Sequence, residues 1–460
     1  MCKSTFFIVL ISAILSSCNN HGDNDDAKAL QHSELSQKID NYIKGHLANG
    51  KFKGSVLVAQ KDSILFQQAY GLADLESNIP HTDSTKFLIG SITKPFTALA
   101  ILLLEKEGKL SLNDSLSNYF PDFPNGNNVT IHHLLTHTSG IRDYHALPDW
   151  KEDSQRDITP NYTVMRMAAE PFDFEPGTSF RYSNTGYILL GLIIEKVSKQ
   201  SFEQFIQKVI LGPLELKNTG IISNGKAVEN LAKGYTSTPL ESKIANYINY
   251  KQPFSSGNMY STPTDLWKFT KAVMYSEFLG KEKTTEVFEN NSGRYGYGWG
   301  IREFNGLHSY GHHGGMNGFV GSISWLPEAE IFICFLTNDD NTPKSTIASD
   351  LASIVRGQEV ETPSKYKIKP LTKNIISTVS GDYLIKRNDT IHVFSTGDRL
   401  FLQETGQAKH ELFNIGDYEF ITPILEFGIQ FSEIEMEKAQ VLSLTGGSSL
   451  SASRVNKQPD

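Results

Sequence analysis

Strand-like segments stand on both sides of a long helical stretch, and this arrangement constrains the fold more than any other feature. Residues 55–59 and 64–70 are rich in apolar side chains, and the polar residues 60–63 between them predict a β-hairpin. Residues 87–273 have a mainly helical pattern, whereas residues 295–337 return to strands. We expect an α/β fold in which both sets of strands form one antiparallel sheet, flanked by helices, with a helical subdomain beside it.

The pattern changes again after a last helix, which is predicted over residues 342–356. Residues 358–373 are polar and contain prolines, as is typical of a linker. From residue 374 to 460, short strands alternate with turns roughly every ten residues, as in small all-β folds. We therefore expect an α/β domain over residues 31–357 and a β-rich, barrel-like C-terminal domain over residues 374–460, with a sandwich as the alternative.

The N-terminus has the pattern of an export signal. Lys3 precedes an apolar stretch, residues 6–15, that is too short to span a bilayer. The stretch leads into a segment that resembles the lipobox of bacterial lipoproteins, Leu15-Ser16-Ser17-Cys18. We therefore expect residues 1–18 to be a lipoprotein signal peptide and Cys18 to carry the lipid. The alternative is an ordinary secretory signal that is cut near Ser17.

A polar tether is predicted to follow over residues 19–30, where the composition is that of a disordered spacer. Such a chain would be a lipoprotein anchored to a membrane of the bacterial cell envelope, facing the periplasm or the cell surface. Cysteine usage agrees with export without disulfides. Cys2 and Cys18 lie in the leader, and the one remaining cysteine, Cys334, lies in an apolar run where we expect a core residue.

The charge of the chain excludes one class of partner. A net charge of −8 argues against nucleic acid, because phosphate binding needs a basic surface. A metal site is not expected either. His133 and His137 are four residues apart, as zinc ligands on a helix are, but the residues between them lack the glutamate of H-E-x-x-H. We predict no cofactor.

The first candidate motif for chemistry is Ser91-Ile92-Thr93-Lys94, placed where a helix is predicted to begin. Residues three apart share one face of a helix, so the Lys94 nitrogen lies within reach of the Ser91 oxygen. A serine becomes a strong nucleophile when a base takes its proton, and a lysine can be that base where burial suppresses its charge. The free N–H groups of a first helical turn can also hold a developing negative charge. The alternative is that Ser91 is only a helix N-cap.

Three further segments give Ser91 its context. A tyrosine beside a basic cluster can act as a phenolate or as a proton relay. Glycines in a strand let a ligand approach the backbone closely. The segments that carry these features, together with a histidine-containing loop, are Tyr182-Ser183-Asn184, Gly311-His312-His313-Gly314-Gly315 and His133-Leu134-Leu135-Thr136-His137-Thr138-Ser139-Gly140. The first pattern recurs at Tyr247-Ile248-Asn249, and S-x-x-K recurs twice in predicted loops, so each motif is weak alone.

In their order along the chain these motifs resemble the serine β-lactamase/penicillin-binding family. The resemblance is to the branch that includes class C β-lactamases, D-aminopeptidases and D-Ala-D-Ala carboxypeptidases, and it covers about residues 35–357. It implies that Ser91 attacks a carbonyl and forms an acyl-enzyme. It also implies that Lys94 activates Ser91 and shares the proton transfer with Tyr182.

The resemblance assigns substrate contacts as well. Asn184 would hold the substrate amide, and the backbone N–H groups of Ser91 and Gly315 would form the oxyanion hole. His312, with Gly314 two residues later, would replace the lysine of a Lys-Thr-Gly strand. The register His313-Gly314-Gly315 is the alternative, and because adjacent strand residues face opposite ways we expect only one histidine to line the site.

A histidine in place of that lysine bears on the substrate, because histidine is mostly neutral at pH 7. The resemblance therefore favours a D-amino-acid peptidase or DD-carboxypeptidase-like enzyme over a β-lactamase. Arg181 or Arg302 could supply a cation for a substrate carboxylate. The alternatives are a carboxylesterase or class C-like β-lactamase of the same fold, acting on an ester or β-lactam-like substrate, and a peptidoglycan-peptide sensor without turnover.

Overall fold

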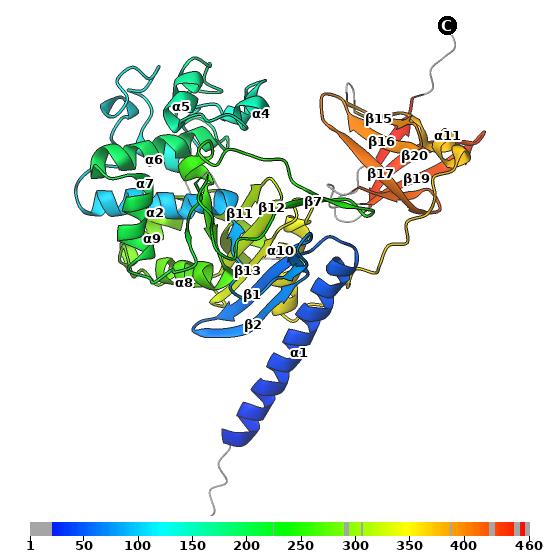
Figure 1. Ribbon diagram of the computed structural model, residues 1–460, viewed down its shortest axis with the longest axis horizontal. Coiled ribbons are helices and arrows are strands. Elements are labelled where there is room, and N and C mark those ends of the chain that lie inside the picture. The colour runs from blue at the N-terminus through cyan, green and yellow to red at the C-terminus, as the bar shows by residue number, and fades with distance from the viewer. Residues whose placement is uncertain are drawn as a thin grey trace, which may run out of the picture.

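The computed structural model shows an α/β part and a C-terminal barrel, with a long helix, α1 (His21–Ala48), extending from the α/β part (Figure 1). It describes residues 21–223, 225–288, 294–304, 307–386, 389–422, 428–445 and 451–455. The predicted signal peptide and its Cys18 lie outside the described residues. Within the described part of the chain, no helix is both long and apolar enough to cross a membrane.

One antiparallel sheet forms the centre of the α/β part. Its six strands are β1 (Gly54–Gln60), β2 (Ser63–Tyr70), β10 (Gly300–Phe304), β11 (Leu307–Met316), β12 (Phe319–Leu326) and β13 (Ile331–Thr337). Their order is β10-β11-β12-β13-β1-β2, so the early hairpin and the late strands join into one sheet, as the sequence predicts. β1 pairs with β13 along its whole length, with Gly54 opposite Thr337 at one end and Gln60 opposite Ile331 at the other.

Side-chain alternation along the central strands divides the interior into two apolar cores. Leu57 and Cys334 belong to the core shared with the helices of the middle segment. Val56 and Phe335 belong to a second core with α1 and the last helix of this part, α10 (Lys344–Val355). β12 and β13 lie between the two cores and are buried throughout. Because β13 is covered on both faces, its residues 331–336 are all apolar. The Cys334 thiol is fully buried, in agreement with the predicted core role.

The middle segment supplies the helices that hold the site. Two of them, α2 (Thr93–Lys106) and α6 (Asn184–Ser198), pack against each other and are buried along most of their length. The remaining helices are α3 (Ile131–Leu135), α4 (Trp150–Asp153), α5 (Pro160–Ala168), α7 (Phe202–Ile206), α8 (Pro263–Met274) and α9 (Lys281–Phe288). Short strands pair as β3 (Leu72–Asp74) with β4 (Ile79–Pro80), β7 (Tyr235–Ser237) with β8 (Ser242–Ile244), and β9 (Met259–Ser261) with both β5 (Phe87–Leu88) and β6 (Gly220–Ile221).

The C-terminal part is a closed antiparallel barrel, so the sandwich alternative is wrong. Its strands run in chain order and the last pairs with the first, which removes the free edges of an open sheet. Alternate side chains fill the interior, among them Tyr383, Phe420 and Phe431. The elements are α11 (Lys373–Val379), β14 (Gly381–Lys386), β15 (Asp389–Thr396), β16 (Arg399–Glu404), β17 (Lys409–Gly416), β18 (Glu419–Ile421), β19 (Gly428–Glu435), β20 (Lys438–Thr445) and β21 (Ser451–Arg454).

The structure describes parts of two segments that we predicted to be a tether and a linker. α1 already begins inside the predicted tether, residues 19–30, because a nucleated helix gains one hydrogen bond for each residue added. The predicted linker lies against the end of α1. There the Asn49 side chain accepts from the Tyr366 N–H (2.7 Å) and donates to the carbonyl of Ser364 (2.8 Å). These bonds hold the linker against the α/β part.

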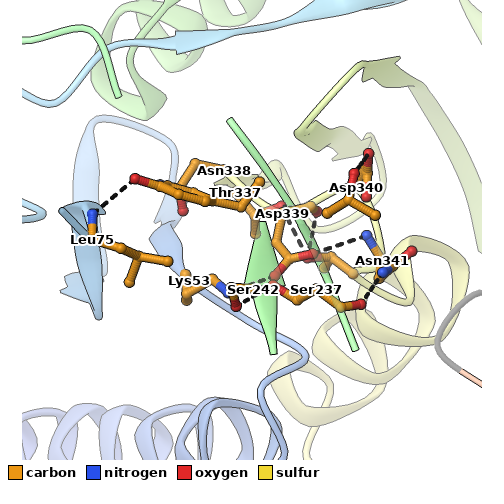
Figure 2. A network of polar contacts seen from close by, with 12 residues as sticks. Lys53, Leu75, Ser237, Ser242, Thr337, Asn338, Asp339, Asp340 and Asn341 are labelled. Carbon is orange, nitrogen blue, oxygen red and sulfur yellow. Dashed lines mark hydrogen bonds and ion pairs between the residues drawn. The ribbon is translucent and has the colours of Figure 1, made fainter. Parts of the chain in front are cut away.

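A polar network at the end of β13 joins the sheet to the β7–β8 hairpin (Figure 2). Lys53 is buried there, forms an ion pair with Asp339 (2.6 Å) and donates to the Ser237 hydroxyl (2.7 Å). The Asp340 carboxylate accepts from the N–H of Gly318 (3.1 Å), in the turn between β11 and β12. The network therefore supports the end of β11, the strand that carries the His-Gly segment.

Candidate active site

Ser91 lies in a 3₁₀ turn (Gly90–Ile92) that leads directly into α2. The residue at the N-cap of α2 is Ile92, and no side chain caps this helix start. The alternative in which Ser91 acts as an N-cap is therefore wrong, and its hydroxyl is free for another partner. Pro95 follows in the first helical turn, where the missing N–H had no partner to lose.

The partner of the Ser91 hydroxyl is Lys94. Its Nζ lies 3.0 Å from Ser91 Oγ, 2.7 Å from Asn184 Oδ1 and 2.8 Å from the carbonyl oxygen of Ser256. Lys94 is fully buried, and burial lowers its pKa to about 7 against the opposing effect of the Asp143 charge. Two of the three neighbours are carbonyl oxygens, which only accept. In the neutral amine both N–H donors satisfy them, and the lone pair is left for the Ser91 proton.

Tyr182 is the second proton-carrying group beside Ser91. Its ring lies 4.8 Å from Lys94 Nζ. Among the described residues its buried hydroxyl has no hydrogen bond of ordinary geometry. Burial raises the pKa of Tyr182 above its usual value, and the nearby Ser91 hydroxyl only partly opposes this effect. Of the two roles that the sequence leaves open, the resting site therefore fits a protonated relay rather than a phenolate.

Asn184 links Lys94 to the side chains of Asp143 and His145, which the sequence analysis missed. Asn184 Nδ2 donates to the Asp143 carboxylate (2.9 Å), which turns its Oδ1 toward Lys94. Nδ1 of His145 also lies 2.7 Å from the Asp143 carboxylate. Burial raises the pKa of Asp143, but the bonds from His145 and Asn184 outweigh it and hold the pKa below its usual value. The only signal for Asp143 was its position just after the histidine-containing loop.

Two glycines bring the Ser91 turn against β11. Gly90 has φ +49°, and a Cβ there would lie 2.5 Å from the carbonyl oxygen of Gly315. A Cβ on Gly314 would lie 1.9 Å from the carbonyl oxygen of Ile89. Side chains at these positions would separate the turn from the strand. The close approach makes the N–H groups of Ser91 and Gly315 the candidates for an oxyanion hole.

His312 faces the Ser91 side of β11. Its ring centroid is 6.1 Å from that of Tyr182. Its Nδ1 lies 2.6 Å from the carbonyl oxygen of His313 and must therefore carry the proton, so Nε2 accepts from the Tyr295 hydroxyl (2.9 Å). Burial, followed by the Lys94 charge, holds the pKa of His312 well below its usual value. The His312 imidazole is neutral and supplies no fixed positive charge.

His313 faces the other side of β11, next to Arg302. The Arg302 guanidinium donates to His313 Nε2, and His313 Nδ1 lies 2.9 Å from the Ser322 hydroxyl. Burial, followed by the Arg302 charge, lowers the pKa of His313 to about 3. We expected one histidine at the site, but both border the cavity beside Ser91. The cavity reaches both because Gly300 and Gly311, paired across β10 and β11, carry no side chains there.

That cavity has a volume of about 340 Å³. Of the predicted site residues its described lining includes Ser91, Tyr182, His312, Gly314 and Gly315. Lys94 and Asn184 contact these residues but are not part of the lining. Arg302 does line the cavity, together with Arg294, Tyr295 and Lys344, which the sequence analysis did not single out.

The other predicted cation lies elsewhere: Arg181 is exposed and forms an ion pair with Asp173 (3.0 Å). The two histidines spaced four apart stabilise the local backbone. His133 Nδ1 accepts from the backbone N–H of Thr130 (3.2 Å) at the start of α3. His137 Nδ1 accepts from the backbone N–H of Ser183 (3.1 Å), next to Tyr182.

Comparison with known proteins gives relatives that cover most of this chain. Penicillin-binding protein 4* of Bacillus subtilis (strain 168) is 30% identical over 412 residues, which are 83% of this chain and 90% of that protein. Protein flp of Staphylococcus aureus (strain MW2) is 32% identical over 326 residues, 66% of this chain and 64% of that protein.

Solved structures show the same fold. The octameric penicillin-binding protein homologue from Pyrococcus abyssi has a TM-score of 0.65 at 26% identity and covers 90% of this chain and 99% of its own. D-amino acid amidase from Ochrobactrum anthropi SV3 has a TM-score of 0.63 at 22% identity, over 70% of this chain and 99% of its own. The family model named Beta-lactamase matches residues 39–355. The chain therefore belongs to the β-lactamase family of serine hydrolases, which also includes penicillin-binding proteins.

Proposed function

We propose that the chain cleaves D-amino-acid peptides through an acyl-enzyme on Ser91, as a D-peptidase or a DD-carboxypeptidase-like enzyme. The observation that carries the proposal is the 3.0 Å contact between Ser91 Oγ and a fully buried Lys94, whose pKa burial lowers to about 7. A base with that pKa is unprotonated often enough at neutral pH to take the serine proton, yet basic enough to hold it.

In the acylation step, Lys94 takes the Ser91 proton while Oγ forms a bond to the substrate carbonyl carbon. The carbonyl oxygen becomes an oxyanion next to the N–H groups of Ser91 and Gly315. The carbon–nitrogen bond then breaks, and the leaving amine receives the proton from the Lys94 ammonium through the Tyr182 hydroxyl. The acyl group stays on Ser91 as an ester.

In the deacylation step, a water molecule attacks the ester carbon and gives its proton to the same Lys94 and Tyr182 pair. The bond to Ser91 Oγ breaks, Oγ takes that proton back, and the free acid leaves. One water is consumed for each bond that is cleaved, and no cofactor takes part. A phenol with a raised pKa suits this relay, because Tyr182 releases its proton only as it accepts another.

The cavity supports a substrate with a free carboxylate. His312 is neutral, so the permanent positive charge of the cavity comes from its other lining residues, among them Arg302, whose planar guanidinium matches a carboxylate in two parallel hydrogen bonds. A C-terminal D-residue as leaving group would present such a carboxylate. The names of two structural neighbours, a D-amino acid amidase and a D-stereospecific amidohydrolase, agree with D-configured substrates.

The first test uses time-resolved intact mass spectra of the protein with benzylpenicillin, followed together with drug consumption. A lasting adduct that Ser91→Ala abolishes supports a penicillin-binding D-peptidase. Drug consumed without a lasting adduct indicates a β-lactamase. If neither an adduct nor drug consumption is observed, the result favours an esterase or a D-peptidase whose cleft excludes the bicyclic ring. Hydrolysis of N-acyl-D-Ala-D-Ala by wild type but not by Ser91→Ala is expected. Turnover retained by Ser91→Ala contradicts the acyl-enzyme mechanism.

We further propose that Cys18 is lipidated and tethers the enzyme to a membrane of the cell envelope, close to peptide substrates of the cell wall. The proposal rests on the lipobox-like Leu15-Ser16-Ser17-Cys18. Cys18→Ala is expected to move the protein from the membrane fraction to the soluble fraction. A variant that stays with the membrane contradicts a lipid anchor at this residue.

A further inference from the structure

We infer that the cavity beside Ser91 binds a leaving group with two acidic groups, so that the preferred scissile bond precedes an acidic D-amino acid such as D-glutamate. This inference rests on the proposed function and specifies its substrate. The positive charge of the side chains that line the cavity supports this inference.

Three cations line the cavity: Arg294, Arg302 and Lys344. No acidic side chain is among its described lining residues. None of the three cations forms an ion pair with any described carboxylate. The chain as a whole carries a net charge of −8, so this local excess of positive charge runs against its composition. A cavity lined by one sign of charge attracts and holds ligands of the opposite sign.

The histidine between the cations cannot balance them. Arg302 occupies His313 Nε2, and the charges of Arg302 and Lys344 both act on the same imidazole. A neutral imidazole accepts a hydrogen bond from a guanidinium but offers it no negative charge. Among the described residues, therefore, no carboxylate supplies a counter-charge to the cations beside His313, and an acidic ligand would supply one.

The number of cations points to more than one acidic group. A D-alanine leaving group has one carboxylate, which the forked guanidinium of Arg302 can bind alone. Arg294 and Lys344 would then stay unpaired beside it. A second carboxylate on the side chain of the leaving residue gives them a partner. The cavity volume of about 340 Å³ lies at the small end of the range for ligand sites, so it suits a single residue rather than a polymer.

The bond changes are those of the proposed acylation. Ser91 Oγ bonds to the carbonyl carbon of the acyl residue, the bond to the nitrogen of the acidic residue breaks, and that nitrogen leaves as an amine with the relayed proton. The second carboxylate takes no part in bond making. It contributes only binding energy, so we expect its effect in kcat/KM, which reports acylation at low substrate concentration.

The decisive experiment compares N-acyl-D-Ala-D-Glu with N-acyl-D-Ala-D-Gln, a pair of nearly equal shape that differs by one negative charge. We expect kcat/KM to be about tenfold higher for the D-Glu peptide in wild type, since a carboxylate that meets the half-buried Lys344 gains more than a fully exposed pair does. Lys344→Met is expected to reduce the ratio of the two kcat/KM values to within about threefold. Lys373→Met is the matched control, because Lys373 is the first residue of α11 as Lys344 is of α10, and it should leave the ratio unchanged.

A second measurement needs no turnover. D-glutamate should protect Ser91 from labelling by a fluorophosphonate at lower concentration than D-glutamine does, and Lys344→Met should remove the difference. Equal kcat/KM values for the two peptides, or a ratio that Lys344→Met leaves intact, overturn the inference while Ser91-dependent cleavage upholds the proposed function. If wild type cleaves neither peptide and neither compound protects Ser91, this inference fails, and the proposed function fails with it only if N-acyl-D-Ala-D-Ala is not cleaved either.

Discussion

Two lysines are buried in the α/β part, and their surroundings differ in one respect. Lys53 is 8% exposed and touches a carboxylate, that of Asp339, at 2.6 Å. Lys94 is 0% exposed and touches only uncharged oxygens, those of Ser91, Asn184 and Ser256. A carboxylate in contact compensates the burial of a lysine charge, whereas neutral oxygens leave burial to lower the pKa. Contact with a carboxylate therefore separates a structural lysine from a lysine that can act as a base.

The two lysines also support different parts of one strand. Lys94 holds the nucleophile that lies against the glycines of β11. Lys53 belongs to the network of Figure 2, which reaches the turn after β11 through Asp340 and Gly318. Variants of the two lysines should consequently fail in different ways, one in chemistry and the other in folding.

The largest expected effect is on Lys94. Lys94→Met should lower kcat/KM by about 10⁴-fold, the upper end for general-base catalysis, because both the activation of Ser91 and the proton relay depend on this amine. Removing a buried charge is favourable, while the carbonyl oxygens of Asn184 and Ser256 lose a donor at about 1–3 kcal/mol each. The two effects oppose each other, so thermal unfolding should change little.

The matched control is Lys106→Met, at the other end of α2, where the exposed ammonium donates to the carbonyl of Phe278 (2.6 Å). It should change neither activity nor thermal unfolding appreciably. Lys94→Met with more than about a tenth of the wild-type kcat/KM would show that another group deprotonates Ser91.

The second effect is on Lys53, and it should appear in stability. Lys53→Met leaves the buried Asp339 carboxylate without its cation and should lower the free energy of unfolding by about 3–5 kcal/mol. Denaturant unfolding measures this loss, and activity per folded molecule at low temperature should stay near that of wild type. Adding Asp339→Asn should restore part of the stability, because it removes the unpaired charge. A double variant less stable than Lys53→Met would mean that the network stabilises the fold through contacts other than this ion pair.

The sheet was predictable from sequence because apolar residues recur along β1, β2, β12 and β13 and turn signals separate these strands. The S-x-x-K contact was predictable because helical geometry places residues three apart on one face. Strand alternation likewise placed the side chains of His312 and His313 on opposite faces of β11, but the expectation that only one of them borders the cavity was wrong. These are local rules, and short segments obey them regardless of the rest of the chain.

What sequence did not predict depends on long-range contacts. Asp143 meets Asn184 only because the loop after α3 reaches the start of α6, and Lys344, the first residue of α10, lines the same cavity as Arg302 of β10 although the two are far apart in sequence. The two Tyr-x-Asn copies also look alike in sequence. In the structure Tyr182 lines the cavity, whereas Tyr247 is 56% exposed and is not part of the described lining.

The smallest expected effect is on the pH dependence of kcat/KM. It concerns Asp143, whose negative charge raises the pKa of Lys94 and so acts against the effect of burial. Lys94 acts in its neutral form, so activity should rise with pH through about 7, its lowered pKa. The charge of Asp143 favours protonated Lys94. Asp143→Asn should therefore lower the pKa of Lys94 and move the acid limb to lower pH, by up to about one unit. Asp62→Asn, which removes an exposed partner of Lys271, should leave the limb in place. If the acid limb of the Asp143→Asn pH profile moves to higher pH or does not move, it reports the titration of a group other than Lys94. The distinction between the two lysines would then lose its basis.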